Sequence, residues 1–271
     1  MRFHKVAAWC GVVLMAAAMC GCNKLRARDQ LNKGVGAYRN AQFQQAIKHF
    51  QTAIDLDPSL LMARLYLATA YFQLYVPSGD SPENLKIADQ TIDAFNDVLK
   101  YDPENVNAIS SIATVYYYQK KFDKAKELQM RRLKIKEDEN NPEVYYWIGQ
   151  LDWDVAYPRR MQLRKDLNIA NPIDSRKPDI FPPIPAKDRE KLAEDNGPLV
   201  DEGINMLQKA VDLKPDYVEA ISYLNLMYRE KSDLEPDESS RMADIAKANE
   251  LSVKATDLMK AQTQKAAEGV K

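Results

Sequence analysis

Side chains that could carry out metal, thiol or acid–base chemistry are scarce in this chain and are not grouped. His49 is the only histidine after His4, and the three cysteines, Cys10, Cys20 and Cys22, all lie before residue 23. Zinc sites need several histidine or cysteine ligands, and a thiol mechanism needs a cysteine activated by a neighbouring base. His49 alone meets neither need, so we expect no catalytic residue, no metal site and no cofactor.

Other patterns that resemble catalytic motifs lack the element that each motif requires. No G-x-S-x-G sequence is present to hold a serine nucleophile. The glycines of Gly34-Val35-Gly36 follow no predicted strand, so they do not form a phosphate-binding loop. The acidic runs at 137–139 and 235–238 lie at predicted helix ends, where carboxylates commonly cap helices. The sequence therefore predicts a binding protein rather than an enzyme.

The charge balance argues against nucleic acid as the partner. The 271 residues carry 38 basic and 39 acidic side chains, with 45% hydrophobic and 28% charged residues. Removing Arg2 and Lys5 with the targeting segment described next leaves 36 basic residues, a net charge of about −3. A nucleic-acid-binding domain concentrates basic residues on one face. We expect no nucleic-acid partner.

Residues 1–21 have the layout of a targeting segment. Basic residues stand at its start, and the apolar run Val6 to Met19 has signal-peptide length. This run is too short to predict a membrane span. It ends in A-A-A-M-C-G-C-N, and small residues before a cysteine resemble a bacterial lipobox. The resemblance implies that the cysteine is diacylated and becomes the new N-terminus. Plain secretion with cleavage nearby is the alternative.

Cys22 is the better candidate for lipidation, because Gly21 precedes it. Cys20 is the alternative, although Met19 before it is a poorer fit, and Met19 also replaces the leucine usual three residues before Cys22. We expect a lipid anchor in the bacterial cell envelope, facing the periplasm. Asn23 is not the aspartate of an inner-membrane retention signal, which favours the outer membrane. Residues 22–28 are predicted to be a polar tether.

Gln30 to Pro58 has the pattern of two short amphipathic helices joined by a tight turn. Small residues are expected where the helices cross, an aromatic ring between them, and a proline at the end of the unit. The residues at these places are Gly34, Ala46, Phe50, Ala53 and Pro58. This spacing resembles the tetratricopeptide repeat (TPR), whose period is about 34 residues.

Further copies of this unit follow in phase along the chain. The small residue of the first helix recurs at Gly34, Ala68, Ala113 and Gly149. The first and third of these spacings are close to one repeat period, whereas the second is longer because of a turn-rich loop around 77–82. The third copy departs from the pattern at Gln129 and Arg132. A fifth first helix spans 217–231.

The resemblance implies an all-α solenoid of about five repeats over residues 29–261, closed by a capping helix from Pro236 to about Ala261. We expect an insert at 158–198, in which prolines interrupt any helix. The exception is a helix over 187–194, which leads into the second helix of repeat four. The insert either lies in the groove as an internal ligand or braces repeat four, and bracing is favoured. Residues 262–271 are expected to be a flexible tail.

First helices line the inner face of a TPR array, so the resemblance also implies a partner-binding groove. The residues that it places there are Tyr38, Arg39, Phe72, Gln73, Asn107, Ser110, Thr114, Tyr117, Tyr118, Tyr146, Gln150, Trp153 and Asp154. Rings with amides between them suit a peptide or a helix of a partner protein in an envelope complex. Alternatively, several of these rings pack on neighbouring helices, as we expect for Tyr145 and Trp147. A glycan is the alternative ligand, because rings also stack on sugars.

Overall fold

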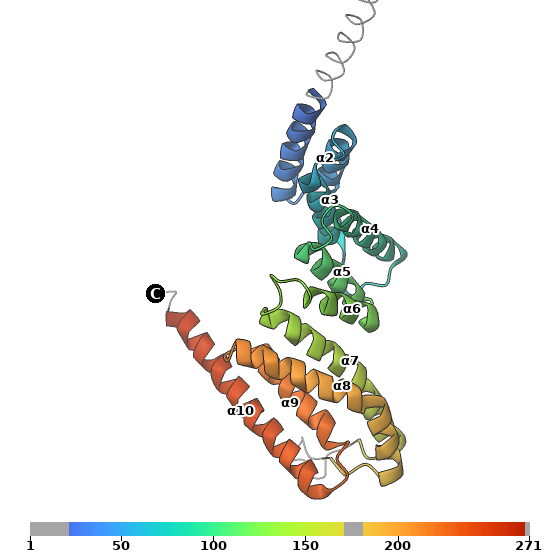
Figure 1. Ribbon diagram of the computed structural model, residues 1–271, viewed down its shortest axis with the longest axis vertical. Helices are drawn as coiled ribbons and strands as arrows, with labels where there is room; N and C mark the ends of the chain where they lie inside the picture. The colour runs from blue at the N-terminus through green and yellow to red at the C-terminus, as the bar shows by residue number, and fades with distance from the viewer. Residues whose placement is uncertain (1–21, 171–180, 269–271) are drawn as a thin grey trace, which may run out of the picture. The chain divides into compact units, whose positions relative to one another are not determined.

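The computed structural model describes residues 22–170 and 181–268, and within these ranges every regular element is an α-helix (Figure 1). The chain divides into two compact units, and the boundary falls between Lys121 and Phe122. The all-α class expected from the repeats is confirmed for the described residues.

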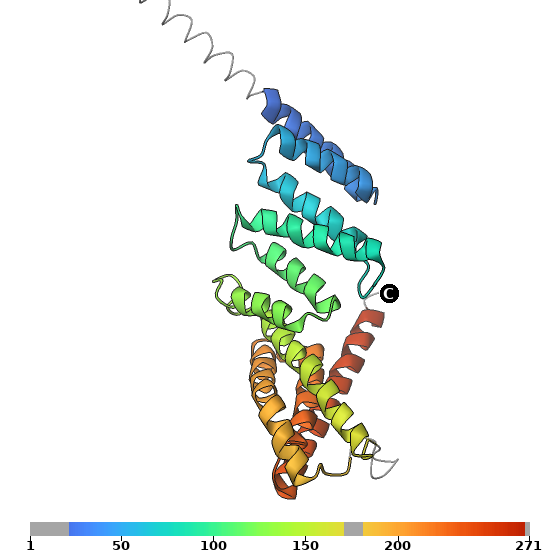
Figure 2. The ribbon, with the colours of Figure 1, turned by 90° about the vertical axis from the view of Figure 1, so that its right-hand side faces the viewer.

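The first unit is a series of helical hairpins (Figure 2). Its helices are residues 22–39, α2 (Phe43–Leu56), α3 (Leu61–Leu74), α4 (Pro82–Leu99) and α5 (Val106–Tyr118). Phe50 of α2 is fully buried. Its ring stacks on that of Tyr66 of α3, with the two ring centroids 5.5 Å apart. A Cβ at Gly34 would collide with the Phe50 ring, so the close crossing predicted at this glycine is confirmed.

One side chain closes the long loop between α3 and α4. The amide of Asn84 accepts from the N–H of Val76 at 2.8 Å and donates to the carbonyls of Val76 and Gly79 at 2.9 and 2.8 Å. Ser81 caps the start of α4 by accepting from the N–H of Asn84. The extra length between the second and third repeats is therefore an ordered loop that leaves the hairpin intact.

The second unit contains five described helices, of which α7, α8 and α10 are longer than any described helix of the first unit. They are α6 (Phe122–Arg132), α7 (Pro142–Asp166), α8 (Ala186–Leu213), α9 (Val218–Ser232) and α10 (Glu238–Glu268). Leu207 of α8, Leu224 and Met227 of α9, and Leu251 of α10 share one core. A Cβ at Gly149 would lie 3.0 Å from the carbonyl oxygen of Gly203, so α7 and α8 cross at a pair of glycines.

The departures of the third repeat are accommodated by a buried polar cluster. Gln129 and Arg132 of α6 are both buried, and Arg132 donates to Gln129 at 3.1 Å. Its Nε also donates to Asp138 at 2.6 Å, within a buried ion pair. These polar residues can be buried where the repeat pattern has phenylalanine and alanine, because they satisfy one another's hydrogen-bonding groups.

The prediction that prolines interrupt the helices around the insert 158–198 was wrong at both ends. Pro158 lies inside α7, which continues to Asp166, and Pro198 lies inside α8. Packing of α7 along α8 overrides the local cost of each proline. Gly197 also lacks the Cβ that would crowd the ring of Pro198 in helical conformation. The predicted helix over 187–194 is part of α8.

The described part of the insert outside the helices braces the second unit. Arg164 of α7 donates to the carbonyl of Pro182 at 2.9 Å and lies over the ring of Phe181. Arg241 of α10 donates to the carbonyl of Phe181, and Ile184 is buried. The segment thus contacts both α7 and α10, as the bracing interpretation predicts. Residues 171–180 of the insert lie outside the described residues.

Two other predicted boundaries change. Residues 22–28, expected to be a tether, are helical, and Ala27 is fully buried. The final helix does not end near Ala261 but continues to Glu268, so most of the expected flexible tail of 262–271 is helical. Both segments are rich in Ala, Lys, Arg, Gln, Leu and Glu, which favour helix strongly. The predicted signal peptide, 1–21, lies outside the described residues.

Candidate functional site

Most of the predicted groove residues in the first unit belong to the packing between helices or lie singly on the surface. The ring of Tyr38 meets those of Phe43 and Tyr66 at 5.4 and 6.4 Å. Phe72 meets the buried ring of Phe95 at 6.4 Å. The hydroxyl of Thr114 donates to its own helix, to the carbonyl of Ser110 at 2.9 Å. Exposed or partly exposed side chains are Arg39, Gln73 and Asn107.

Tyr117 and Tyr118 form a ring pair at the end of α5. Their centroids are 5.4 Å apart, and both rings are half-buried. Tyr118 also lies near Tyr75; burial raises the pKa of the Tyr75 phenol, and Tyr118 adds to the shift. Tyr117 and Tyr118 are thus predicted groove residues of the first unit whose rings lie together.

The second unit gathers its predicted residues on one face of α7. Tyr146, Gln150, Trp153 and Asp154 have the spacing i, i+4, i+7 and i+8, which places them on one side of a helix. Tyr146 and Trp153 are half-buried against the core that α8, α9 and α10 share. Gln150 is buried and Asp154 half-buried beside them.

Rings that the sequence analysis did not select complete this face. Tyr223 of α9 lies 5.6 Å from Tyr146 and 5.5 Å from Trp153, so it joins the two α7 rings. Tyr217 lies 5.3 Å from Tyr146, and Tyr157 stacks on Trp153 at 4.6 Å. We call these five residues the aromatic cluster: Tyr146, Trp153, Tyr157, Tyr217 and Tyr223. A signal was present in the sequence, because Tyr217 and Tyr223 both belong to the fifth first helix predicted there.

Two phenols of the aromatic cluster, Tyr217 and Tyr223, have raised pKa values. Burial raises the pKa of Tyr217 to about 12, with Glu143 and Glu219 adding to the shift. Burial also raises the pKa of Tyr223, and the neighbouring carboxylate of Asp154 acts in the same direction. Both hydroxyls are therefore hydrogen-bond donors at neutral pH. Tyr145, assigned to packing from the sequence, does pack against this core, and Trp147 contacts the edge of the cluster through Tyr146 at 5.8 Å.

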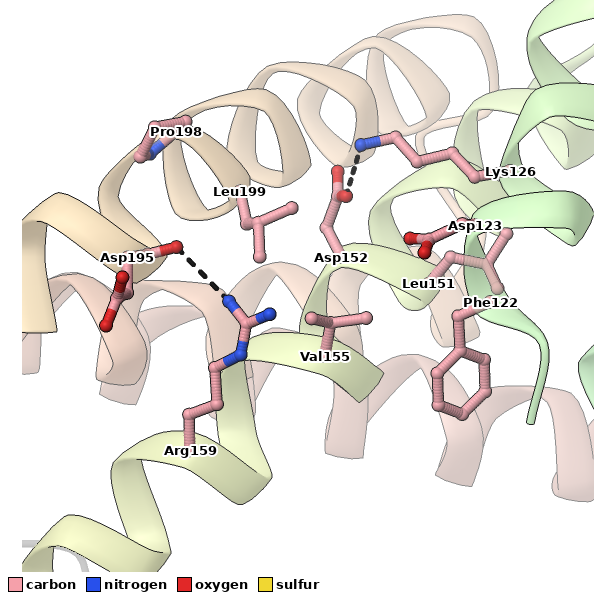
Figure 3. A pocket seen from close by; sticks show the side chains of 10 residues that line it. All are labelled: Phe122, Asp123, Lys126, Leu151, Asp152, Val155, Arg159, Asp195, Pro198 and Leu199. Carbon is pink, nitrogen blue, oxygen red and sulfur yellow. Dashed lines mark hydrogen bonds and ion pairs between the residues drawn. The ribbon is translucent and has the colours of Figure 1, made fainter.

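A second feature of this unit is a cavity of about 320 Å³ between α6, α7 and α8 (Figure 3). Its walls include Phe122, Leu151, Val155 and Leu199. Charged groups also line it, and the most buried of them is Asp152, whose side chain is only 1% exposed. No sequence pattern indicates this site, because its residues come from three helices and form no motif. Within the described residues, no three His, Cys, Asp or Glu side chains are close enough together to hold a metal ion.

The proposed lipidation site lies at the edge of the described chain. Cys22 is an exposed free thiol. Among the helices of the described residues, none combines the length and the apolar character that crossing a bilayer requires.

Comparison with known proteins gives one partial match among curated sequences. No protein-family model matches the chain. The Hsp70-Hsp90 organizing protein 3 of Arabidopsis thaliana is 29% identical over 108 residues. This alignment covers 40% of the present chain and 17% of the plant protein.

Solved structures match over most of the chain. MamA from Desulfovibrio magneticus RS-1, solved from residue 41 to its end, gives a TM-score of 0.56 at 17% identity; the match covers 88% of this chain and 97% of that one. YrrB, described as a TPR protein with an unusual peptide-binding site, gives 0.51 at 14% identity, covering 86% and 90%. Identities this low establish architecture alone. Together with the helical hairpins and the small residues at their crossings, they show that the chain has the tetratricopeptide-repeat fold.

Proposed function

We propose that the chain is a non-catalytic, lipid-anchored scaffold of the bacterial cell envelope that binds a peptide or a helix of a partner protein. The observation that carries the binding proposal is the aromatic cluster beside Asp154. Half-buried rings offer apolar area whose conformation is already fixed, so little side-chain entropy is lost on binding. YrrB, which shares the fold, is described as having a peptide-binding site.

The ring geometry favours a peptide over a glycan. Trp153 and Tyr157 stack nearly parallel, with planes 22° apart, so one face of the Trp153 indole is already covered. Tyr223 meets Trp153 edge to face at 84°. Sugars bind by lying flat on an open ring face, whereas apolar side chains also fit between ring edges. The hydroxyls of Tyr217 and Tyr223 can donate to backbone carbonyls of a peptide.

The envelope location rests on the sequence. The basic start, the apolar run and the small residues before Cys22 resemble a lipoprotein leader. A diacylated Cys22 with a further acyl chain on its amine would give stable membrane attachment, since two or more chains are needed for that. Asn23 favours the outer membrane. We propose a partner within an envelope complex and no nucleic-acid partner.

The test is a crosslinking pull-down from envelope membranes with the full-length protein. We expect one or more envelope proteins, and a diacyl group on Cys22 in the mass of the N-terminal peptide. The double variant Tyr146→Ala/Trp153→Ala should reduce partner recovery by about thirtyfold or more, because truncating even one central aromatic residue often costs about 2 kcal/mol. Met62→Ala/Leu85→Ala, which truncates two exposed apolar residues outside the aromatic cluster, is the matched control and should retain recovery.

The readouts separate the parts of the proposal. Helical circular dichroism must be unchanged in the double variant, so that lost recovery reports binding. Recovery equal to that of the unmodified chain would remove the aromatic cluster as the binding site. An unmodified N-terminus would remove the anchor, and binding of purified cell-wall glycan without any protein partner would replace the scaffold with the glycan alternative.

A further inference from the structure

The cavity between α6, α7 and α8 combines apolar walls with a buried carboxylate. Its volume of about 320 Å³ is at the lower end of cavities that hold small organic ligands. Figure 3 shows Asp152 rising from α7 between Leu199 of α8 and Lys126 of α6. The space suits one long side chain rather than several residues of a peptide.

Only one of the two carboxylate oxygens of Asp152 accepts a hydrogen bond within the described part of the chain. Its Oδ1 accepts from Lys126 Nζ at 2.5 Å. Its Oδ2 is buried and has no hydrogen-bond partner among the described residues. A buried carboxylate oxygen without a hydrogen-bond partner carries a desolvation cost, which a bound cation would relieve.

The charges around Asp152 do not balance. Lys126 is shared, because its Nζ also contacts Glu202 Oε2 of α8 at 2.7 Å. Two carboxylates therefore depend on one ammonium group. Burial raises the pKa of Asp152 to about 7, Lys126 opposes the shift and Glu202 adds to it. Burial also lowers the pKa of Lys126, but its two carboxylate partners outweigh this effect and raise it.

The other charged groups of the cavity lining do not supply the positive charge that Asp152 and Glu202 lack. Arg159 of α7 directs its guanidinium to the backbone carbonyl of Asp195 on α8, at 3.3 Å, and is exposed. Asp123 of α6 and the side chain of Asp195 are exposed acids in the cavity lining. The groups that face Asp152 thus include more acids than bases, and a further cation would complete the set.

We propose that this cavity binds a primary alkyl ammonium group, with its amine on Asp152 Oδ2 and its alkyl stem against Leu199 and Val155. The carrier is a lysine side chain of the protein partner, and this identification rests on the function proposed above. An ammonium group is a point charge that one free oxygen can accept. The planar guanidinium of arginine prefers two carboxylate oxygens, and Oδ1 is already occupied.

The proposal is tested with purified full-length protein and small amines, by saturation-transfer NMR of the ligand. N-acetyl-lysine methylamide and n-butylamine should bind. N-acetyl-norleucine methylamide, which differs from the first only by lacking the amine, should bind at least tenfold more weakly, as should the arginine analogue. Binding of butylamine without the lysine analogue would identify a free amine rather than a side chain as the ligand and would overturn the lysine assignment.

The pH dependence supplies a readout specific to Asp152. An ammonium group binds the ionised carboxylate, so binding must release the proton that Asp152 holds below its pKa of about 7. Affinity for the lysine analogue should therefore fall about tenfold from pH 8 to pH 6. An affinity independent of pH over this range would contradict the role given to Asp152.

Variants separate the carboxylate from the cavity. Asp152→Asn should lose at least tenfold in affinity, whereas Asp201→Asn, an exposed acid on α8, should bind as the unmodified chain does. Leu199→Phe fills the cavity without changing a charge and should also abolish binding, which keeps the test valid if Asp152→Asn does not fold. Preference for butyrate over butylamine would overturn the proposal in favour of an anion site. Partner recovery in the pull-down is a separate measurement, so either proposal can fail without the other.

Discussion

At the scale of single residues, glycines decide how closely helices approach. Gly34 lies against the ring of Phe50, and Gly149 against Leu207 and the backbone of Gly203. A Cβ at Gly36, on the same helix as Gly34, would lie within 4 Å of no heavy atom beyond the nearby backbone of its own helix. Two glycines of one helix therefore have opposite roles: one makes room for a neighbour, and the other only weakens the helix.

We expect opposite effects from the same substitution at these two positions. Gly34→Ala should lower the free energy of unfolding by about 1–3 kcal/mol, because the buried Phe50 ring must move. Gly36→Ala should raise it by about 0.5–1 kcal/mol, because alanine favours helix over glycine. Urea denaturation followed by circular dichroism measures both. A similar loss in the two variants would show that the Phe50 contact does not set the crossing.

At the scale of elements, buried ion pairs hold the second half of α7. Arg164 is fully buried and donates through Nε to Asp233 at 2.8 Å, where Arg160 also donates at 2.9 Å. Arg160 pairs with Glu230 of α9 as well, at 2.9 Å. The same arginine, Arg164, holds the insert at Pro182. This network connects α7, α9 and the segment before α8. It holds the part of α7 that extends past the length of an ordinary repeat helix.

Removing one member of this network should cost more than removing an exposed neighbour. Arg164→Ala leaves Asp233 buried with a lost partner and releases the carbonyl of Pro182, so we expect a loss of about 3–5 kcal/mol in the free energy of unfolding. Arg159→Ala, the exposed neighbour on α7, should change it by about 0.5 kcal/mol or less. Proteolysis between Ile169 and Ile184 should become faster only in Arg164→Ala. Equal protection in both variants would mean that the insert is held by other contacts.

At the scale of the whole molecule, the chain consists of two units with separate cores. Phe50, Ala46 and Ile47 belong to a cluster of the first unit, and Leu207 and Leu224 to one of the second. After residue 21, both tryptophans, Trp147 and Trp153, lie in the second unit. Tryptophan fluorescence therefore reports one unit, whereas circular dichroism reports both.

This separation predicts that damage to one core leaves the other in place. Phe50→Ala should destabilise the first unit by about 3–5 kcal/mol, because it empties a fully buried ring site. In the chain without residues 1–21, the circular dichroism transition should then begin at lower urea, while the fluorescence midpoint stays where it was. Movement of both midpoints together would show that the two units unfold as one.

The sequence predicted features that repeat and failed on features that depend on distant contacts. Gly34, Phe50 and Gly149 carry one mechanical role each, which their spacing reveals. The helical conformation around Pro158 and Pro198 depends on packing between α7 and α8, which no local pattern records. The aromatic cluster was half predicted, since Tyr146 and Trp153 share a helix face while Tyr223 reaches them from a helix much further along the chain. Lys126, Asp152 and Glu202 form no motif at all.

The helical conformation of residues 22–28 has a consequence for how the first hairpin would be held by the proposed anchor. A disordered leash lets a tethered domain search a volume whose radius grows with the square root of the leash length. A helix instead advances only about 1.5 Å per residue and does not sample that volume. Under the proposed lipidation of Cys22, the first hairpin would be joined to the lipid by a helix rather than by a leash, so its distance from the anchor would vary little.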